Sequence, residues 1–266
     1  MLTTRYVTGS PNWLDLGTPD LEGAEYFYGG LFGWRFRSAG PQAGGYGMFQ
    51  LDGRTAAGGM TIPPDRATRS AWSVYFRTPD ADATAKAVLA GGGTVLFEPM
   101  DVFEFGRMAV FADPAGVGFA VWQPGTNKGL DVVNDRHTLC WTELYTEDPA
   151  AATAFYGAVL GIRAATIPLP DGTGSYTLLT PAGQGQNASF GGVVPLDDDP
   201  VEAADGPHWE PYFEVADADV TATRAEQLGG KVRLAPTMMD GVGRYAKLTD
   251  PYGARFAVIQ SARTGA

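Results

Sequence analysis

One stretch of the sequence occurs twice. Residues 106–123 read GRMAVFADPAGVGFAVWQ, and residues 243–260 read GRYAKLTDPYGARFAVIQ, in a register that needs no gap. In each copy, Asp-Pro-x-Gly separates two segments with alternating side chains. This pattern predicts a β-hairpin, because Pro fixes φ, Asp can bond the backbone two residues on, and Gly tolerates positive φ. A single hairpin occurs in many folds, but two matching copies indicate a duplicated domain.

The duplication extends toward the start of each copy. Residues 13–20 read WLDLGTPD and residues 141–148 read WTELYTED, and each stretch is followed by a Phe-Tyr-Gly at the same distance. Residues 21–33 carry apolar side chains at helical spacing and end at Gly33, which predicts a helix. Strand-like segments separated by glycines follow this helix. The pattern βαβββ therefore occurs four times, which predicts an α+β fold.

The spacing between the copies defines the expected domains. We predict an N-terminal domain of two βαβββ units over residues 1–125, a linker over 126–136, and a C-terminal domain of two such units over 137–266. The third unit carries a net insertion, for which residues 169–175 and the acidic stretch 197–205 are the candidates. Consecutive aspartates at 197–199 lack the full set of oxygen ligands that a calcium loop needs, so we expect a solvated turn there.

Composition limits the classes of function. The chain has 266 residues, 44% hydrophobic and 18% charged, with a formal net charge of −11. This composition is typical of a globular protein. The negative field disfavours binding to nucleic acid or to anionic membranes. We find no apolar run that could span a bilayer and no secretory signal, and the lone Cys140 cannot form an internal disulfide, so we expect a cytoplasmic protein.

The repeated βαβββ pattern resembles the vicinal oxygen chelate superfamily, which contains glyoxalase I, extradiol dioxygenases and bleomycin-resistance proteins. Within it, the FYG…LFGW stretch at residues 27–34 and the two Asp-Pro-x-Gly hairpins are similar to a duplicated actinobacterial glyoxalase-like group, often labelled "hydroxylase". The resemblance covers nearly the whole chain. It implies two tandem domains, each a cup-shaped mixed β-sheet, with the functional site inside a cup.

Enzymes of that superfamily commonly hold a divalent metal with His, Glu or Gln side chains from four strands. The resemblance places these positions at Trp13, Ser73, Ala120 and the Gly58-Gly59 pair in the first domain. In the second domain it places them at Trp141, Glu210, Ala257 and the Gly191-Gly192 pair. Only Glu210 is a good ligand, so we expect no metal and no other cofactor.

One alternative metal site stays open at this stage. The two histidines, His137 and His208, lie near strand starts of the second domain, with Glu143 and Glu210 close in sequence. A shifted site of two histidines and one carboxylate is chemically reasonable. Trp141 would fill the space that a metal needs, however, so lyase or dioxygenase chemistry is the least favoured hypothesis.

Strand alternation predicts which side chains line the cups. On each strand, the residues that alternate with the cup-lining residues point to the opposite face. These residues are apolar and should pack against the helices. The cup faces instead combine aromatic rings with a few carboxylates, which suits a flat, largely apolar molecule. The expected ligand-binding residues are Trp13, Asp15, Tyr75, Trp122, Trp141, Glu143, Tyr145, His208, Glu210 and Tyr212.

Two functions of different classes follow from these cups. The first is a metal-independent protein that binds a small aromatic, natural-product-like ligand for sequestration or resistance. The second is a metal-independent tailoring enzyme of aromatic polyketide or antibiotic biosynthesis, with Asp15, Glu143 or Glu210 as acid or base. The second domain has more polar cup residues and is favoured as the site. The expected partner is a small aromatic molecule, not nucleic acid or membrane, bound by a monomer or a homodimer.

Overall fold

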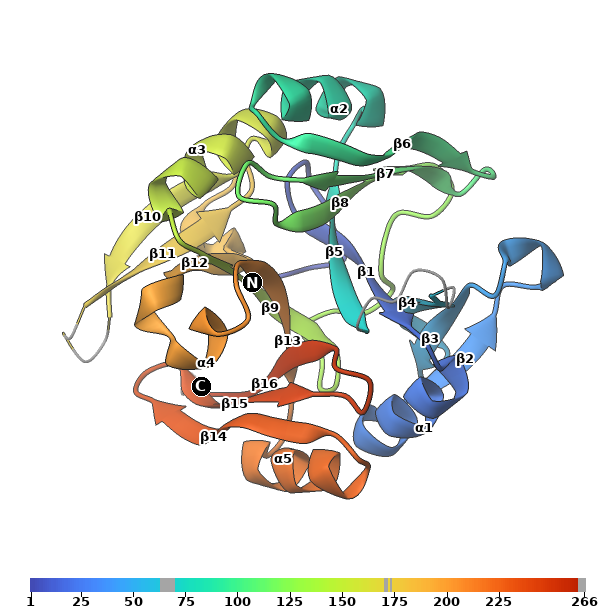
Figure 1. The fold of residues 1–266 in the computed structure, drawn as a ribbon, viewed down its shortest axis with the longest axis vertical. Coiled ribbons are helices and arrows are strands. Elements are labelled where there is room, and N and C mark those ends of the chain that lie inside the picture. Colours follow the sequence, from blue (N-terminus) through green and yellow to red (C-terminus); the bar gives the residue numbers. More distant parts are fainter. Residues whose placement is uncertain (63–69, 170–171, 173, 263–266) are drawn as a thin grey trace. The chain divides into compact units, whose positions relative to one another are not determined.

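The computed structural model describes residues 1–62, 70–169, 172 and 174–262. It contains two mixed eight-stranded sheets, and neither sheet closes on itself (Figure 1). The first has the strand order β2-β3-β4-β1-β5-β8-β7-β6, and the second has the order β10-β11-β12-β9-β13-β16-β15-β14. The second order repeats the first with each strand number raised by eight. The predicted α+β fold with four βαβββ units is confirmed.

The first sheet uses the N-terminal half of the chain. Its elements are β1 (Pro11–Thr18), α1 (Leu21–Phe32), β2 (Arg35–Ser38), β3 (Gly47–Leu51), β4 (Arg54–Thr61), β5 (Ala71–Arg77), α2 (Ala81–Ala90), β6 (Thr94–Val102), β7 (Gly106–Ala112) and β8 (Gly118–Pro124).

The second sheet uses the C-terminal half. Its elements are β9 (Leu139–Thr146), α3 (Pro149–Leu160), β10 (Arg163–Pro168), β11 (Ser175–Thr180), β12 (Gly191–Pro195), α4 (Pro200–Ala203), β13 (His208–Glu214), α5 (Ala218–Gln227), β14 (Lys231–Met239), β15 (Gly243–Thr249) and β16 (Arg255–Ser261).

The repeated sequence signals fix the ends of the first helix in each half. Asp20 and Asp148 cap α1 and α3, because each carboxylate accepts a bond from a backbone N–H in the first turn. Gly33 and Gly161 end these helices with φ of 77° and 68°, a left-handed conformation that favours glycine. The expected helix over residues 21–33 therefore begins and ends as its caps predict.

Each Asp-Pro-x-Gly sequence forms the predicted turn. The Asp113 carboxylate accepts bonds from the backbone N–H groups of Ala115 and Val117, both at 2.9 Å. Asp250 does the same in the second copy, at 2.9 and 2.8 Å. Gly116 and Gly253 adopt φ of 86° and 99°. The turn therefore depends on the Asp oxygen and on a glycine that tolerates positive φ.

The compact units of the molecule do not follow the repeats. One unit contains Met1–Trp13, Ser73–Gly129 and Trp141–Glu210, and the other contains Leu14–Trp72, Leu130–Cys140 and Pro211–Ala266. Each unit thus takes half of its chain from each repeat. In the first unit α2 packs against α3, and in the second α1 packs against α5. The boundaries predicted for the repeats themselves stay a prediction.

A buried polar motif joins the two repeats inside each unit. In the first unit, the Tyr156 hydroxyl donates to Asp113 at 3.2 Å and accepts from the Trp209 indole at 2.9 Å. Tyr28, Asp250 and Trp72 repeat this arrangement in the second unit. Burial raises the pKa of Tyr156 well above its usual value and also raises the pKa of Asp113. Tyr156 therefore stays a neutral hydrogen-bond donor.

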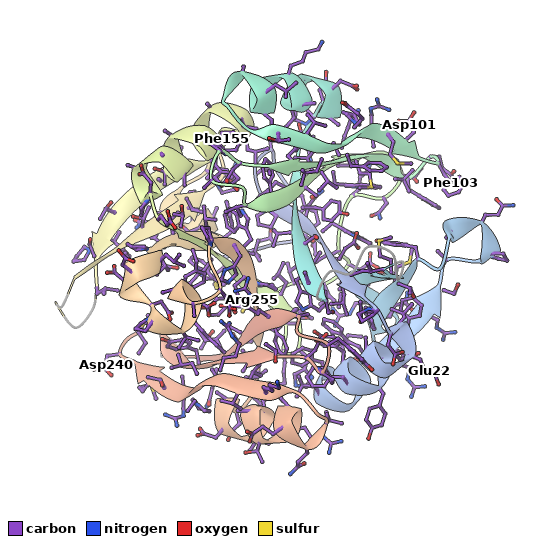
Figure 2. The ribbon with its side chains drawn as sticks, in the orientation of Figure 1. Glu22, Asp101, Phe103, Phe155, Asp240 and Arg255 are labelled. Carbon is purple, nitrogen blue, oxygen red and sulfur yellow. The ribbon has the colours of Figure 1, made fainter. Side chains whose placement is uncertain are left out.

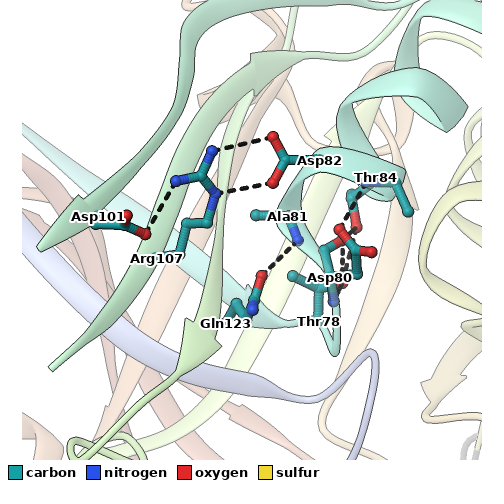
Figure 3. Close-up of polar contacts among 9 residues, drawn as sticks. Thr78, Asp80, Ala81, Asp82, Thr84, Asp101, Arg107 and Gln123 are labelled. Atoms are coloured by element: carbon teal, nitrogen blue, oxygen red, sulfur yellow. Dashed lines mark hydrogen bonds and ion pairs between the residues drawn. The ribbon is translucent and has the colours of Figure 1, made fainter. Parts of the chain in front are cut away.

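Matching ion pairs fix the two long hairpins to the helices beside them. Arg107 on β7 contacts Asp82 on α2 and Asp101 on β6, each at 2.9 Å (Figure 3). Arg244 contacts Asp219 at 2.6 Å in the second repeat. Both arginines therefore form structural ion pairs. Among the described residues, no helix has the length and apolar content needed to cross a membrane.

Candidate functional site

The most polar part of the predicted cup lies on β9 and β11. Trp141, Glu143 and Tyr145 alternate along β9 and therefore share one face. Tyr176 reaches them from β11, and its hydroxyl donates to Glu143 at 2.5 Å and accepts from the Trp141 indole at 3.1 Å. The Tyr145 hydroxyl donates to the second Glu143 oxygen, also at 2.5 Å. We name these four residues the Glu143 cluster.

A glycine on the neighbouring strand makes room for this arrangement. Gly192 on β12 pairs with Glu143 on β9. A Cβ atom at Gly192 would lie 2.0 Å from the Tyr176 hydroxyl, so any other residue would displace the phenol. Burial, followed by the Glu143 charge, raises the pKa of Tyr176 well above its usual value. The phenol therefore remains a donor, and the carboxylate remains an acceptor beside aromatic surface.

The first sheet contains a counterpart of the same construction. The Tyr46 hydroxyl donates to Asp15 at 2.7 Å. Asp15 pairs with Gly58 across β1 and β4, and a Cβ at Gly58 would lie 2.0 Å from the Asp15 carboxylate. A carboxylate, a tyrosine and a glycine thus recur in both sheets. The second sheet adds Tyr145 at the position that Gly17 has in the first repeat.

The two sheets differ in how accessible their tryptophans are. Trp13 and Trp122 stack with ring centroids 6.4 Å apart and are only 6% and 7% exposed. Trp141 and Tyr176 in the second sheet are both partly exposed. The indole of Trp141 is therefore more exposed than the two stacked indoles of the first sheet.

A second polar group lies next to the Glu143 cluster. The Tyr145 ring stacks on the His208 imidazole with centroids 5.1 Å apart and an interplanar angle of 19°. His208, Glu210 and Glu202 each place a possible ligand atom within 4.8 Å of the other two. Glu202 and Glu210 are fully buried. We name these three residues the His208 cluster.

The remaining predicted site residues are less accessible. Tyr75 pairs with Ala120 across β5 and β8 and is 6% exposed. Tyr212 pairs with Ala257 across β13 and β16 and is 5% exposed. Arg255, labelled in Figure 2, was not among the predicted site residues; it is the first residue of β16 and is partly exposed.

Other candidates have structural roles. His137 stacks on Phe32, and its Nδ1 lies 3.0 Å from the Phe32 carbonyl oxygen. It is not part of the His208 cluster, so the metal site of two histidines is not formed among the described residues. The Cys140 thiol donates to the Tyr212 carbonyl, and burial raises its pKa well above the usual value, as expected of an inert thiol.

The sequence reasoning missed Tyr176 and Glu202 of these clusters, and Tyr46 beside Asp15 in the first sheet. Tyr46 and Tyr176 hold the carboxylates, and the signal for them was the pair of glycines opposite, which we had considered only as empty ligand positions. Glu202 lies in the acidic stretch 197–205, where the sequence analysis expected no ligand. That stretch forms the short helix α4 with Asp199 as its cap, not only a solvated turn. Of the other insertion candidate, residues 170, 171 and 173 lie outside the described part of the chain.

The comparisons with known proteins identify the family of this chain. The profile of the Glyoxalase/Bleomycin resistance protein/Dioxygenase superfamily matches residues 10–121 and 137–258. The chain belongs to this superfamily. It is 40% identical over 271 residues to the anthracycline biosynthesis protein DnrV of Streptomyces peucetius, covering 97% of this chain and 95% of the relative. It is 39% identical, with the same coverage, to the anthracycline biosynthesis protein DauV of Streptomyces sp. (strain C5).

The fold is also shared with a solved dioxygenase. The 2,3-dioxygenase LapB from Pseudomonas sp. KL28 superposes with a TM-score of 0.64 at 18% identity, covering 96% of this chain and 93% of the other. At this identity the likeness shows the fold alone. The resemblance stated from the sequence is confirmed, including the duplicated arrangement.

The residues at the superfamily's metal positions do not fit a metal. Trp141 occupies one position, and its indole nitrogen is a donor that is bonded to Tyr176. The glycine position beside it is covered by the Tyr176 phenol. Ala257 is fully buried and has no ligand atom. Glu210 alone keeps a ligating side chain at these positions, so we derive no chemical step through a metal there.

Proposed function

We propose that this protein binds a small, flat, largely apolar aromatic molecule on the cup face of its second sheet, and does so without a metal in the superfamily's usual position. The single observation that carries this proposal is the Glu143 cluster. It places a partly exposed indole and a phenol beside a carboxylate whose orientation is fixed. The names of the related anthracycline biosynthesis proteins support a polycyclic aromatic ligand.

The chemistry of such a ligand matches the cluster. Aromatic rings stack favourably on Trp and Tyr faces, with about 0.5–1.5 kcal/mol per pair beyond the area buried. Ligand hydroxyl or amino groups can donate to Glu143, because a carboxylate oxygen can accept more than one hydrogen bond. Each of the two tyrosine hydroxyls already donates its single proton to Glu143. Few polar groups in fixed positions give specificity, while the rings give affinity.

Binding is better supported than catalysis. A general base must be within reach of the proton that it removes. Both Glu143 oxygens already accept phenol hydrogen bonds, and Asp15 is bonded to Tyr46. Glu210 is fully buried. Each of the three candidate carboxylates would have to give up a hydrogen bond or become exposed before it acted on a substrate.

A metal-independent tailoring enzyme is the second candidate. The observation that favours it is the continuous path of hydrogen bonds from Trp141 through Tyr176 and Glu143 to Tyr145. Glu143, on which the two phenol hydrogen bonds converge, could take a proton from a bound phenol, while the Trp141 indole only orients Tyr176. In this case Glu143 would be the acid or base, and the ligand would be a substrate that leaves changed.

The test is a fluorescence titration of the full chain with a hydroxylated anthraquinone as the probe. Tyr176→Phe removes one donor to Glu143 and should weaken binding about tenfold, equivalent to about 1.4 kcal/mol. Trp141→Phe should weaken binding by a similar factor and remove part of the quenching. Trp13→Phe is the matched control in the first sheet and should bind like the wild type.

The outcomes separate the hypotheses. Equal affinity in all three variants would refute a site at the Glu143 cluster. Weaker binding by Trp13→Phe alone would move the site to the first sheet. Chromatography of the recovered probe then distinguishes the two functions, because an unchanged probe supports binding and a product whose formation needs Glu143 supports the enzyme.

A further inference from the structure

The His208 cluster brings three possible metal-ligand atoms within 4.8 Å of one another. His208 is the first residue of β13, Glu210 follows on the same strand face, and Glu202 comes from α4, between β12 and β13. The His208 side chain is 11% exposed, and that of Glu202 is fully buried. Three chemically compatible donors are therefore gathered in a mostly enclosed place by two separate elements.

The backbone contact of His208 selects the tautomer of its neutral ring. Its Nδ1 atom lies 2.9 Å from the carbonyl oxygen of Gly206. A carbonyl oxygen can only accept, so Nδ1 carries a proton and donates it. In the neutral ring, Nε2 therefore has its lone pair available and directed toward the carboxylates. A histidine oriented by a bond from its other nitrogen to a backbone carbonyl is typical of metal ligands.

The distance between Nε2 and Glu202 supports a bridging ion. The two atoms are 3.3 Å apart. Charge-assisted N–H···O bonds are shorter, about 2.7–2.9 Å. Among the described residues, none forms a hydrogen bond with the buried Nε2 atom. Metal bonds of about 2.1 Å place two neighbouring donors of a tetrahedral site about 3.4 Å apart. The observed separation is therefore that of two ligands of one ion.

We infer that Glu202, His208 and Glu210 form a binding site for one divalent transition-metal ion of the zinc type. One imidazole and two carboxylates suit such an ion. The stacked Tyr145 ring fixes the plane of the imidazole. The ion would join α4 to β13, and a water molecule can complete its coordination.

This site differs from the metal centre of the superfamily and from the expectation that the chain binds no metal. Two of its three ligands, Glu202 and His208, lie outside the superfamily's ligand positions. None of the three ligands belongs to the Glu143 cluster, but Tyr145 contacts both groups, so zinc binding and probe binding are measured separately.

The test measures zinc binding by the full chain, purified without a histidine tag and treated with a chelator. Calorimetry should show one Zn²⁺ bound per chain. The chain contains only two histidines, so nitrogen-15 labelling gives two resolved imidazoles. Zinc should shift the Nε2 resonance of His208 and leave His137 unchanged as an internal control. This measurement needs no variant and therefore does not depend on whether a variant folds.

Variants then assign the ligands. Glu202→Gln and His208→Gln should each weaken zinc binding about 100-fold or more, since even the loss of a residue that only supports a ligand costs 10–100-fold. Asp198→Asn changes an exposed carboxylate in the same acidic segment and should bind like the wild type. The inference is overturned if zinc does not bind stoichiometrically, if the His208 resonance does not move, or if Asp198→Asn is the variant that loses binding. A His208 resonance that reports a protonated, metal-free imidazole would show that a proton bridges the pair instead.

Discussion

The buried Tyr156 hydroxyl offers the sharpest test of how the two repeats are held together. Replacement by phenylalanine keeps the ring and removes one oxygen. Trp209 then loses the acceptor at 2.9 Å, and Asp113 loses the donor at 3.2 Å. Tyr156 is 1% exposed, so water cannot easily replace the hydroxyl. The substitution therefore leaves a buried donor and a buried carboxylate oxygen without this partner.

The expected loss follows from those two groups. A buried polar group left without a partner costs about 1–3 kcal/mol. Because Asp113 keeps its two backbone N–H donors, its share should be the smaller one. We expect the free energy of unfolding to fall by about 2–4 kcal/mol in Tyr156→Phe. With an m-value of about 3 kcal/mol/M in urea, the unfolding midpoint should fall by about 1 M.

The assay is urea unfolding followed by tryptophan fluorescence and far-ultraviolet circular dichroism. Tyr26→Phe is the control, because Tyr26 is a helical tyrosine that is 70% exposed, and it should change the stability by less than about 0.5 kcal/mol. Tyr28→Phe is the equivalent change in the other compact unit and should resemble Tyr156→Phe. A Tyr156→Phe midpoint that moves no further than that of Tyr26→Phe would refute the reasoning.

Two further predictions follow. A fragment that ends at Gly129 should not fold cooperatively, because the buried rings and hydrogen bonds of each compact unit come from both repeats. A sharp urea transition of the isolated fragment would contradict this prediction. Gly192→Ala should displace the Tyr176 phenol, lower the free energy of unfolding by about 1–3 kcal/mol and weaken binding of the aromatic probe. Gly118→Ala, where an added Cβ meets open space, is its control, and an equal effect in both variants would count against the proposed clash.

The local structure was largely predictable because its causes are local. The Asp-Pro-x-Gly turns, the aspartate caps and the glycine helix ends all depend on residues within a few positions of each other. Strand alternation also placed Trp141, Glu143 and Tyr145 on one face, since side chains on a strand point in alternate directions. Because the sequence is duplicated, the two sheets have the same strand order.

Contacts between residues that are far apart in the sequence could not be predicted from local patterns. Tyr176 approaches Glu143 from another strand, and Glu202 approaches His208 from the segment between β12 and β13. A single sequence contains no periodic signal for such contacts. The glycine at position 192 was a clue, but its meaning depends on which side chain lies above it.

The sequence by itself determined the duplicated α+β fold, the turns and caps, and the loss of ligating side chains at most of the superfamily's metal positions, because these depend on residue type and short-range spacing. Only the tertiary structure decided that each compact unit combines halves of both repeats and that Tyr156 is bonded to Asp113. It also decided that Glu202, His208 and Glu210 meet. The physical reason is that burial and hydrogen bonding join atoms that are close in space, whatever their separation along the chain.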